Sequence, residues 1–231
     1  MIQSKQIFVI YQPGMLGTFL CNLLTNNTEF QSDHGGLNTH ASGYSDTDEM
    51  FHSNTDAERI LGYTDSEQEE FFKKFKDKFA VHRLGGYKFI ELPLHKFFAN
   101  RIFVILKPPR EELDKWAVRM VLANQRSYES EYYYKQIKDV SKVPEWFFEE
   151  MSKKEKYKWL IKYNDQFEEY VKKNKIDAIY FDPINLLDSI KVQDLLDTIC
   201  DKAEIDKIVL PENKMLSFLE KNKKLFDNAV K

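Results

Sequence analysis

The segment best suited to chemistry lies near the N-terminus and reads Pro13-Gly14-Met15-Leu16-Gly17-Thr18. It follows an apolar run at 7–11, which predicts a buried strand, and it precedes apolar residues at helical spacing that include Phe19. A strand, a Gly-containing turn and a helix start direct backbone N–H groups and the positive end of a helix dipole at one point, where a phosphate or sulfate can bind. We therefore predict an anion-binding loop; the alternative is an ordinary strand-to-helix turn.

The predicted loop differs from two standard nucleotide-binding loops. It lacks the Gly-Lys-(Ser/Thr) ending with which a P-loop holds a nucleoside triphosphate. Pro13 also stands where the dinucleotide-binding fingerprint has its first glycine. The spacing of Gly14 and Gly17 would still let the backbone approach an anion, and Thr18 adds a hydroxyl at the helix start.

A second candidate for chemistry is His82, which lies at the end of a predicted strand over 79–82, before Gly85 and Gly86. Open α/β sheets place their sites beyond the carboxyl ends of strands. Histidine readily exchanges a proton near neutral pH, so it suits removal of a proton from an attacking hydroxyl. His82 is the predicted catalytic base, and the alternative is a histidine that is satisfied within the fold.

Cations form a third group. Lys107 follows an apolar strand predicted over 102–106, and Arg110 and Lys115 belong to a helix predicted over 110–125. In that helix, Lys115 lies on the face opposite the apolar stripe. These side chains would either grip a phosphate or form an ordinary solvated surface.

The elements that carry these residues alternate between strand and helix. Apolar runs predict strands at 7–11, 79–82, 102–106 and 177–181, separated by helical patterns. Such alternation predicts an α/β fold with a mainly parallel sheet and helices on both faces. We predict a single domain over 1–231, with a polar loop at 31–65 and a helical cap inserted at 128–174.

This order of motifs resembles the sulfotransferases that use 3′-phosphoadenosine 5′-phosphosulfate (PAPS), over roughly 7–202. The loop from Pro13 to Thr18 is similar to the family's 5′-phosphosulfate loop, and Val81-His82-Arg83-Leu84 to its histidine motif. Lys107-Pro108-Pro109-Arg110 resembles the start of its 3′-phosphate motif. The resemblance implies a P-loop-like sulfotransferase fold, PAPS as cofactor, its desulfated product PAP as ligand, no metal, and a small-molecule or carbohydrate hydroxyl as acceptor. It assigns Pro13, Gly14, Met15, Leu16, Gly17, Thr18, Phe19, Lys107, Arg110 and Lys115 to the cofactor and His82 to catalysis.

The chain also departs from that family. Gly14 stands where the family carries a lysine that stabilises charge on the bridging oxygen, Lys107 replaces an arginine, and Lys115 replaces a serine. Two alternatives therefore stay open. One is a non-catalytic binding protein of the same fold, and the other is a kinase-like phosphoryl transferase, which would need Mg²⁺.

Composition limits the partners. The net charge of −3 provides no global attraction to nucleic acid or anionic membrane, and the N-terminal apolar run is too short to span a bilayer. The two cysteines suggest no disulfide framework, which fits a reducing compartment, so we expect a cytoplasmic protein. His34, His40 and His52 lie among aspartates, but their spacing matches no standard metal site.

Overall fold

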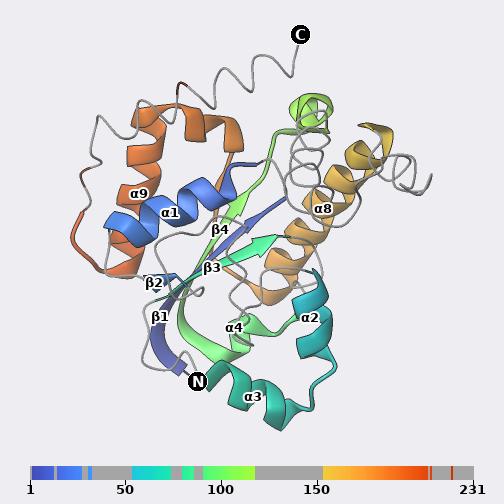
Figure 1. Cartoon of the computed structure of the whole chain (residues 1–231), viewed down its shortest axis with the longest axis vertical. Helices are drawn as coiled ribbons and strands as arrows, with labels where there is room; N and C mark the ends of the chain where they lie inside the picture. Colours follow the sequence, from blue (N-terminus) through green and yellow to red (C-terminus); the bar gives the residue numbers. More distant parts are fainter. Residues whose placement is uncertain are drawn as a thin grey trace, which may run out of the picture.

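The protein is built on a parallel sheet of five strands in the order β2-β3-β1-β4-β5 (Figure 1). The computed structural model describes residues 2–12, 15–27, 31–32, 54–73, 80–85, 91–117, 153–207, 209 and 220. The strands are β1 (Ile2–Tyr11), β2 (Gln31–Ser32), β3 (Ala80–Gly85), β4 (Phe98–Leu106) and β5 (Ala178–Phe181). Every described pairing between neighbouring strands is parallel.

Helices cover both faces of this sheet. The described helices include α1 (Gly17–Asn27), α2 (Asn54–Leu61), α3 (Asp65–Lys73), α4 (Leu94–Phe97), α8 (Lys153–Asn174) and α9 (Ser189–Ala203), with 3-10 turns η2 (Arg110–Glu112) and η5 (Pro183–Leu187). In Figure 1, α1 and α9 lie on one side of the sheet, and α8 lies on the other side with α2, α3 and α4. The predicted α/β fold with a mainly parallel sheet is confirmed.

The two central strands are apolar on both faces. Residues 7–10 of β1 and 103–106 of β4 are all almost completely buried. A parallel sheet covered by helices on both faces requires such continuous apolar runs, rather than the alternation of a half-exposed strand. This is why the sequence marks these two strands so clearly.

An aromatic row crosses the centre of the sheet. Phe8 in β1 is in register with His82 in β3 and with Phe103 in β4. The Phe8 ring stacks on both, with centroids 4.8 Å from His82 and 5.2 Å from Phe103. Tyr170 of α8 meets Phe103 edge-on, at 6.5 Å between centroids, so this row forms the core under α8.

The direction of the connections reverses between β1 and β4. The chain leaves β1 through α1 toward β2 at one edge of the sheet, and it leaves β4 toward β5 at the other edge. Since β1 and β4 are neighbours, the segments that follow them turn to opposite edges of the sheet, which makes this a topological switch point. In open α/β sheets, ligands bind at this kind of switch point.

Two predicted segments differ from what the structure describes. Residues 153–174 of the predicted cap form α8, which packs on the sheet as part of the β4–β5 crossover because Leu160, Tyr163 and Phe167 are buried in the core. The predicted polar loop at 31–65 contains β2 and α2, and α3 begins at its last residue. Residues 118–152 and 33–53 lie outside the described part of the chain.

Some helices and strands begin or end at other residues than predicted. A capping box formed by Thr64 and Glu67 starts α3, in which Thr64 N donates to Glu67 Oε2 at 2.7 Å. The helix predicted from 110 begins with the 3-10 turn η2, and β3 continues to Gly85. None of the described helices is long and apolar enough to cross a membrane.

Candidate functional site

The loop after β1 forms a tight turn before α1. Met15 N donates to Gln12 O at 3.1 Å, and Gln12 N donates to Met15 Sδ at 3.4 Å. Leu16 has φ of 60°, in the left-handed region that a leucine rarely adopts. The helical ladder then begins with Leu20 N donating to Leu16 O at 3.2 Å. Pro13 and Gly14 lie outside the described residues.

This geometry leaves some of the predicted loop able to bind an anion. The N–H groups of Gly17 and Thr18 precede the first bond of the ladder, where an α-helix offers donors and a partial positive charge. Met15 is fully buried and its N–H is used within the turn, while Leu16 packs against the core, so these two side chains contribute structure. Phe19 is likewise buried.

Gln12 is a residue that sequence reasoning missed. Its side chain is 1% exposed, and its Nε2 has no hydrogen-bond partner among the described residues. A buried amide donor without a partner is unfavourable in a fold, so it invites an explanation. Its position directly after β1, at the switch point, makes an anionic ligand oxygen a suitable acceptor.

The role of Gly17 differs from the one we predicted. A Cβ built at this residue would lie 2.1 Å from Cγ and Cδ1 of Tyr11. The glycine therefore makes room for the Tyr11 ring, which occupies the space that a side chain would need. A loss of ligand binding in a Gly17→Val variant would thus reflect this clash, and would not demonstrate close approach of an anion.

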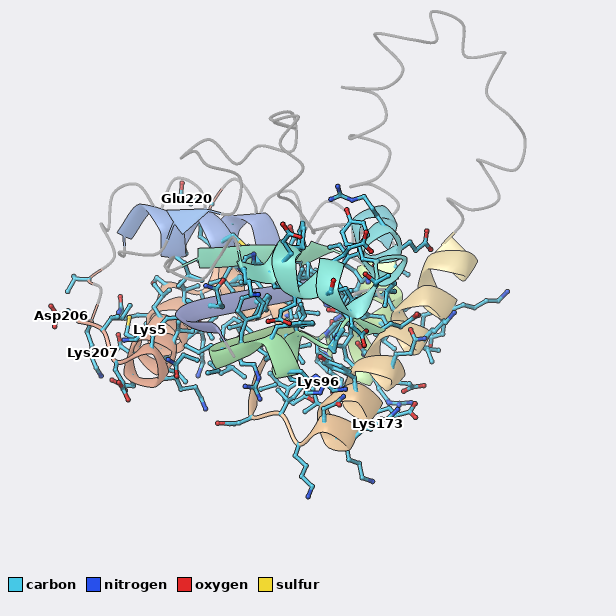
Figure 2. The ribbon with its side chains drawn as sticks, turned by 90° about the horizontal axis from the view of Figure 1, so that it is seen from below. Lys5, Lys96, Lys173, Asp206, Lys207 and Glu220 are labelled. Carbon is cyan, nitrogen blue, oxygen red and sulfur yellow. The ribbon has the colours of Figure 1, made fainter. Side chains whose placement is uncertain are left out.

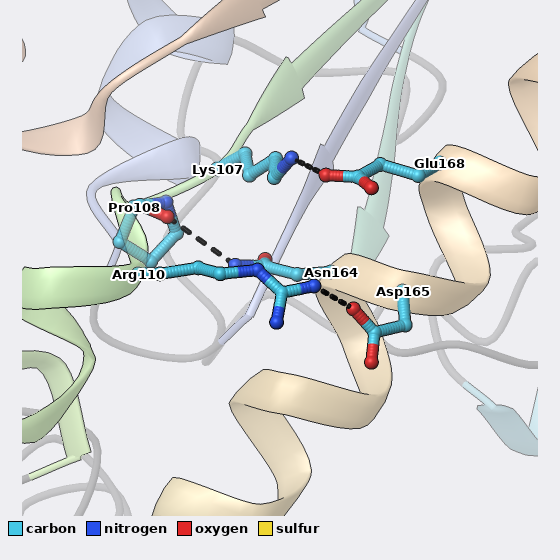
Figure 3. A network of polar contacts seen from close by, with 6 residues as sticks. All are labelled: Lys107, Pro108, Arg110, Asn164, Asp165 and Glu168. Atoms are coloured by element: carbon cyan, nitrogen blue, oxygen red, sulfur yellow. Dashed lines mark hydrogen bonds and ion pairs between the residues drawn. The ribbon is translucent and has the colours of Figure 1, made fainter.

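On the other side of the switch point, the segment after β4 is tied to α8 through its backbone (Figure 3). Tyr163 Oη donates to Leu106 O at 3.3 Å, and Asn164 Nδ2 donates to Pro108 O at 3.2 Å. Both side chains are buried. Burial raises the pKa of Tyr163 well above its usual value, with a further contribution from Tyr11, so the phenol stays a neutral donor.

The same segment presents two of the three predicted cations to α8. Lys107 Nζ forms an ion pair with Glu168, and Arg110 Nη2 pairs with Asp165 Oδ1 at 2.5 Å (Figure 3). Lys107 Nζ also lies 5.6 Å from the centroid of the Tyr180 ring. The structure thus brings Lys107 and Arg110 to one helix. Lys115 instead pairs with Glu112 of its own turn at 2.7 Å.

Acidic groups continue along this edge to β5. Asp182 directly follows β5, and its pKa is raised, mainly by burial and also by Glu112 and Glu111, although a hydrogen bond from Ile184 N opposes the shift. The carboxyl edge at β4 and β5 is therefore not a plain basic patch. Its cations are already balanced by carboxylates.

His82 is not placed where a catalytic base is needed. It is the third residue of a strand that runs on to Gly85, its ring is 0% exposed, and it stacks on Phe8. Its Nε2 lies 2.5 Å from Oε1 of the buried Gln6. A base must touch the acceptor's proton. Its burial and its stack on Phe8 therefore favour a role within the fold over the predicted base.

Besides Gln12, the sequence reading missed the residues of α8. Asn164 carried a signal, because it interrupts an otherwise apolar helical stripe and is in fact buried. Asp165 and Glu168 gave no such signal in the sequence, since exposed carboxylates on a charged helix are usually solvated. No group of three or more His, Cys, Asp or Glu residues suited to a metal ion occurs among the described residues.

Comparisons with known proteins give one finding. No family model matches the chain, and no curated protein matches it. A solved structure, the sulfotransferase from Alicyclobacillus acidocaldarius, is similar with a TM-score of 0.46 and 10% identity, covering 96% of this chain and 93% of that one. A likeness at this level shows neither family membership nor an activity.

Proposed function

We propose that the protein binds PAPS and transfers its sulfuryl group to a hydroxyl of a small-molecule or carbohydrate acceptor. One observation supports the proposal: an anion-suited turn follows β1 and two cations follow β4, on the two sides of the point where the sheet reverses. Two separate elements suited to anions at one switch point suit a nucleotide with two separate anionic groups. The loop motifs that resemble PAPS-dependent enzymes are the same segments.

In this proposal, each element has one task. The N–H groups of Gly17 and Thr18, with the Gln12 amide, would hold the 5′-phosphosulfate. Lys107 and Arg110 would hold the 3′-phosphate. As the acceptor oxygen bonds to sulfur, the bond from sulfur to the bridging phosphate oxygen breaks, and the acceptor's proton leaves to a base.

The proposal makes no use of a described histidine as that base. His82 is buried in β3, and His95 lies in α4 at the amino end of β4, away from the switch point. Lys115 is likewise left out of the phosphate grip, because it pairs within its own turn.

Calorimetric titration with PAP, with AMP and ATP as controls, tests the nucleotide site. We expect micromolar binding of PAP that depends on the 3′-phosphate, without Mg²⁺. Equal binding of ATP that requires Mg²⁺ would instead support the phosphoryl transferase. No binding of PAP to the folded protein would overturn the proposal.

A non-catalytic binding protein is the second candidate. The burial of His82 favours it, as does Gly14 in place of the family's lysine. Transfer of labelled sulfate from PAPS to a panel of hydroxyl acceptors separates the two candidates. PAP binding without any transfer would support the non-catalytic reading.

A further inference from the structure

The two cations proposed to hold the 3′-phosphate already hold carboxylates. Glu168 and Asp165 are three residues apart on α8, so they lie on one side of the helix, and they meet Lys107 and Arg110 respectively (Figure 3). Any phosphate that binds these cations must take the place of these carboxylates or share the cations with them.

The ion pairs are not what fixes the segment to α8. Tyr163 and Asn164 hold the carbonyl groups of Leu106 and Pro108 by buried hydrogen bonds. Lys107 N in turn donates to Phe181 O of β5 at 2.9 Å. The backbone is therefore held independently, and the Lys107 and Arg110 side chains can change partners without moving the segment.

Because most of these side chains are well exposed, such an exchange of partners costs little free energy. The side chains of Glu168 and Asp165 are 48% and 50% exposed, and that of Arg110 is 64% exposed, whereas that of Lys107 is only 22% exposed. Half-exposed ion pairs are weak, because water solvates both partners when they separate. A released carboxylate can therefore turn to solvent.

We infer that Glu168 and Asp165 are internal competitors of the bound anion, which stand in for the ligand's phosphate and set both the affinity and the charge preference of the site. This inference rests on the proposed function for the identity of the ligand. A ligand group with a single negative charge would only replace a carboxylate of equal charge at the cation. A phosphate monoester carries up to two charges and three acceptor oxygens, so it can meet both cations and is favoured.

The test is to neutralise each carboxylate. Glu168→Gln is expected to tighten PAP binding roughly three- to tenfold, and Asp165→Asn about twofold, because the second pair is more exposed. AMP lacks the 3′-phosphate, so its affinity should stay unchanged. Glu169→Gln is the matched control, since it removes the same charge from an exposed neighbour on α8.

A second background shows whether the effect passes through the ion pair. In Lys107→Gln protein, adding Glu168→Gln should give no further gain, since the competed cation is gone. Melting temperatures of all variants, measured in parallel, identify any change that comes from unfolding. An equal gain with Glu169→Gln, or an equal gain for AMP, would overturn the inference by indicating a general field effect.

The outcomes also separate the inference from the proposed function. If the wild-type protein binds PAP and neither carboxylate variant binds it more tightly, the internal competition is wrong and the nucleotide site stands. If no variant binds PAP, but Glu168→Gln binds inorganic sulfate more tightly than wild type and Glu169→Gln do, the nucleotide assignment is wrong. The competition for an anion then stands.

Discussion

The two ends of β4 both meet α8, but they differ in how their charges are arranged. At the carboxyl end, each of Lys107 and Arg110 is paired with a carboxylate, and the backbone is fixed by hydrogen bonds. At the amino end, a cavity of about 450 Å³ lies between α4 and α8, lined by Lys96, Lys173 and Gln166 among others. Figure 2 shows Lys96 and Lys173 extending on the same side of the molecule.

The amino-end cavity carries carboxylates as well as cations. Neither Lys96 nor Lys173 forms an ion pair within the described part of the chain, yet Glu91 and Glu169 line the same cavity and offset their charge. The carboxyl end instead lies where the connections of the sheet reverse, the place at which open α/β sheets bind ligands. Topology therefore favours the carboxyl end as the anion site.

The largest expected effect concerns His82, which lies inside the sheet between the two ends. His82→Ala should lower the free energy of unfolding by roughly 2–4 kcal/mol, because it removes a buried ring from the Phe8 stack and leaves Gln6 with one partner fewer. Urea denaturation measures this loss. Turnover per folded molecule should be largely retained. Normal stability with abolished turnover would instead restore His82 as the base and extend the site into the sheet.

The next prediction sets the two ends against each other directly. Lys107→Gln should weaken PAP binding roughly 10- to 100-fold, because a charge-assisted hydrogen bond contributes about 1.5–3 kcal/mol. The matched control, Lys96→Gln with Lys173→Gln, removes two cations at the cavity and should leave affinity unchanged. Calorimetric titration of both proteins with PAP measures the two affinities. The reverse pattern would place the ligand in the amino-end cavity and break the comparison.

A stability effect should also distinguish the two ends. Asn164→Ala should cost about 1–3 kcal/mol, because it leaves the carbonyl of the buried Pro108 without its donor. Asn174 makes a comparable bond to Tyr170 O at 2.9 Å but is only half-buried, so Asn174→Ala should cost under about 1 kcal/mol. Equal losses in urea denaturation would mean that the segment after β4 is no more firmly held than the end of α8.

The sequence predicted the buried strands and the edge of the sheet at which their loops lie, but not the side-chain contacts at that edge. Buried strands such as 102–106 are continuous apolar runs, and a parallel sheet with its loops at one edge follows from them. The pairing of Lys107 with Glu168 joins residues far apart in the chain, and no local pattern indicates it. The burial of His82 was equally hidden, because a histidine within a strand reads the same whether it faces solvent, a ligand or a phenylalanine.

The smallest effect is a pH dependence of opposite sign at the two ends. Burial, Arg101 and Lys96 lower the pKa of His95 below 6.5, so the unfolded chain takes up the proton first as pH falls, and stability declines below about pH 6.5. The raised pKa of Asp182 acts the other way, because the folded protein takes up that proton first and gains stability as pH falls toward 3.8. Urea denaturation of His95→Asn and Asp182→Asn across pH 4 to 8 separates them.

We expect His95→Asn to flatten the decline below about pH 6.5, by under about 1 kcal/mol because the imidazole is only partly buried. Asp182→Asn keeps an oxygen that can accept from Ile184 N, so it should stabilise the protein at neutral pH, with the difference shrinking as the pH falls. The charged residues around His95 also include Glu91, Glu169, Lys96, Lys173 and Arg101. Because the charge of Lys96 lowers the pKa of His95, Lys96→Gln should raise that pKa in an NMR titration. If the stability of His95→Asn fell below about pH 6.5 as steeply as that of the wild type, the charges at the amino end would be solvated as fully as those of a plain surface.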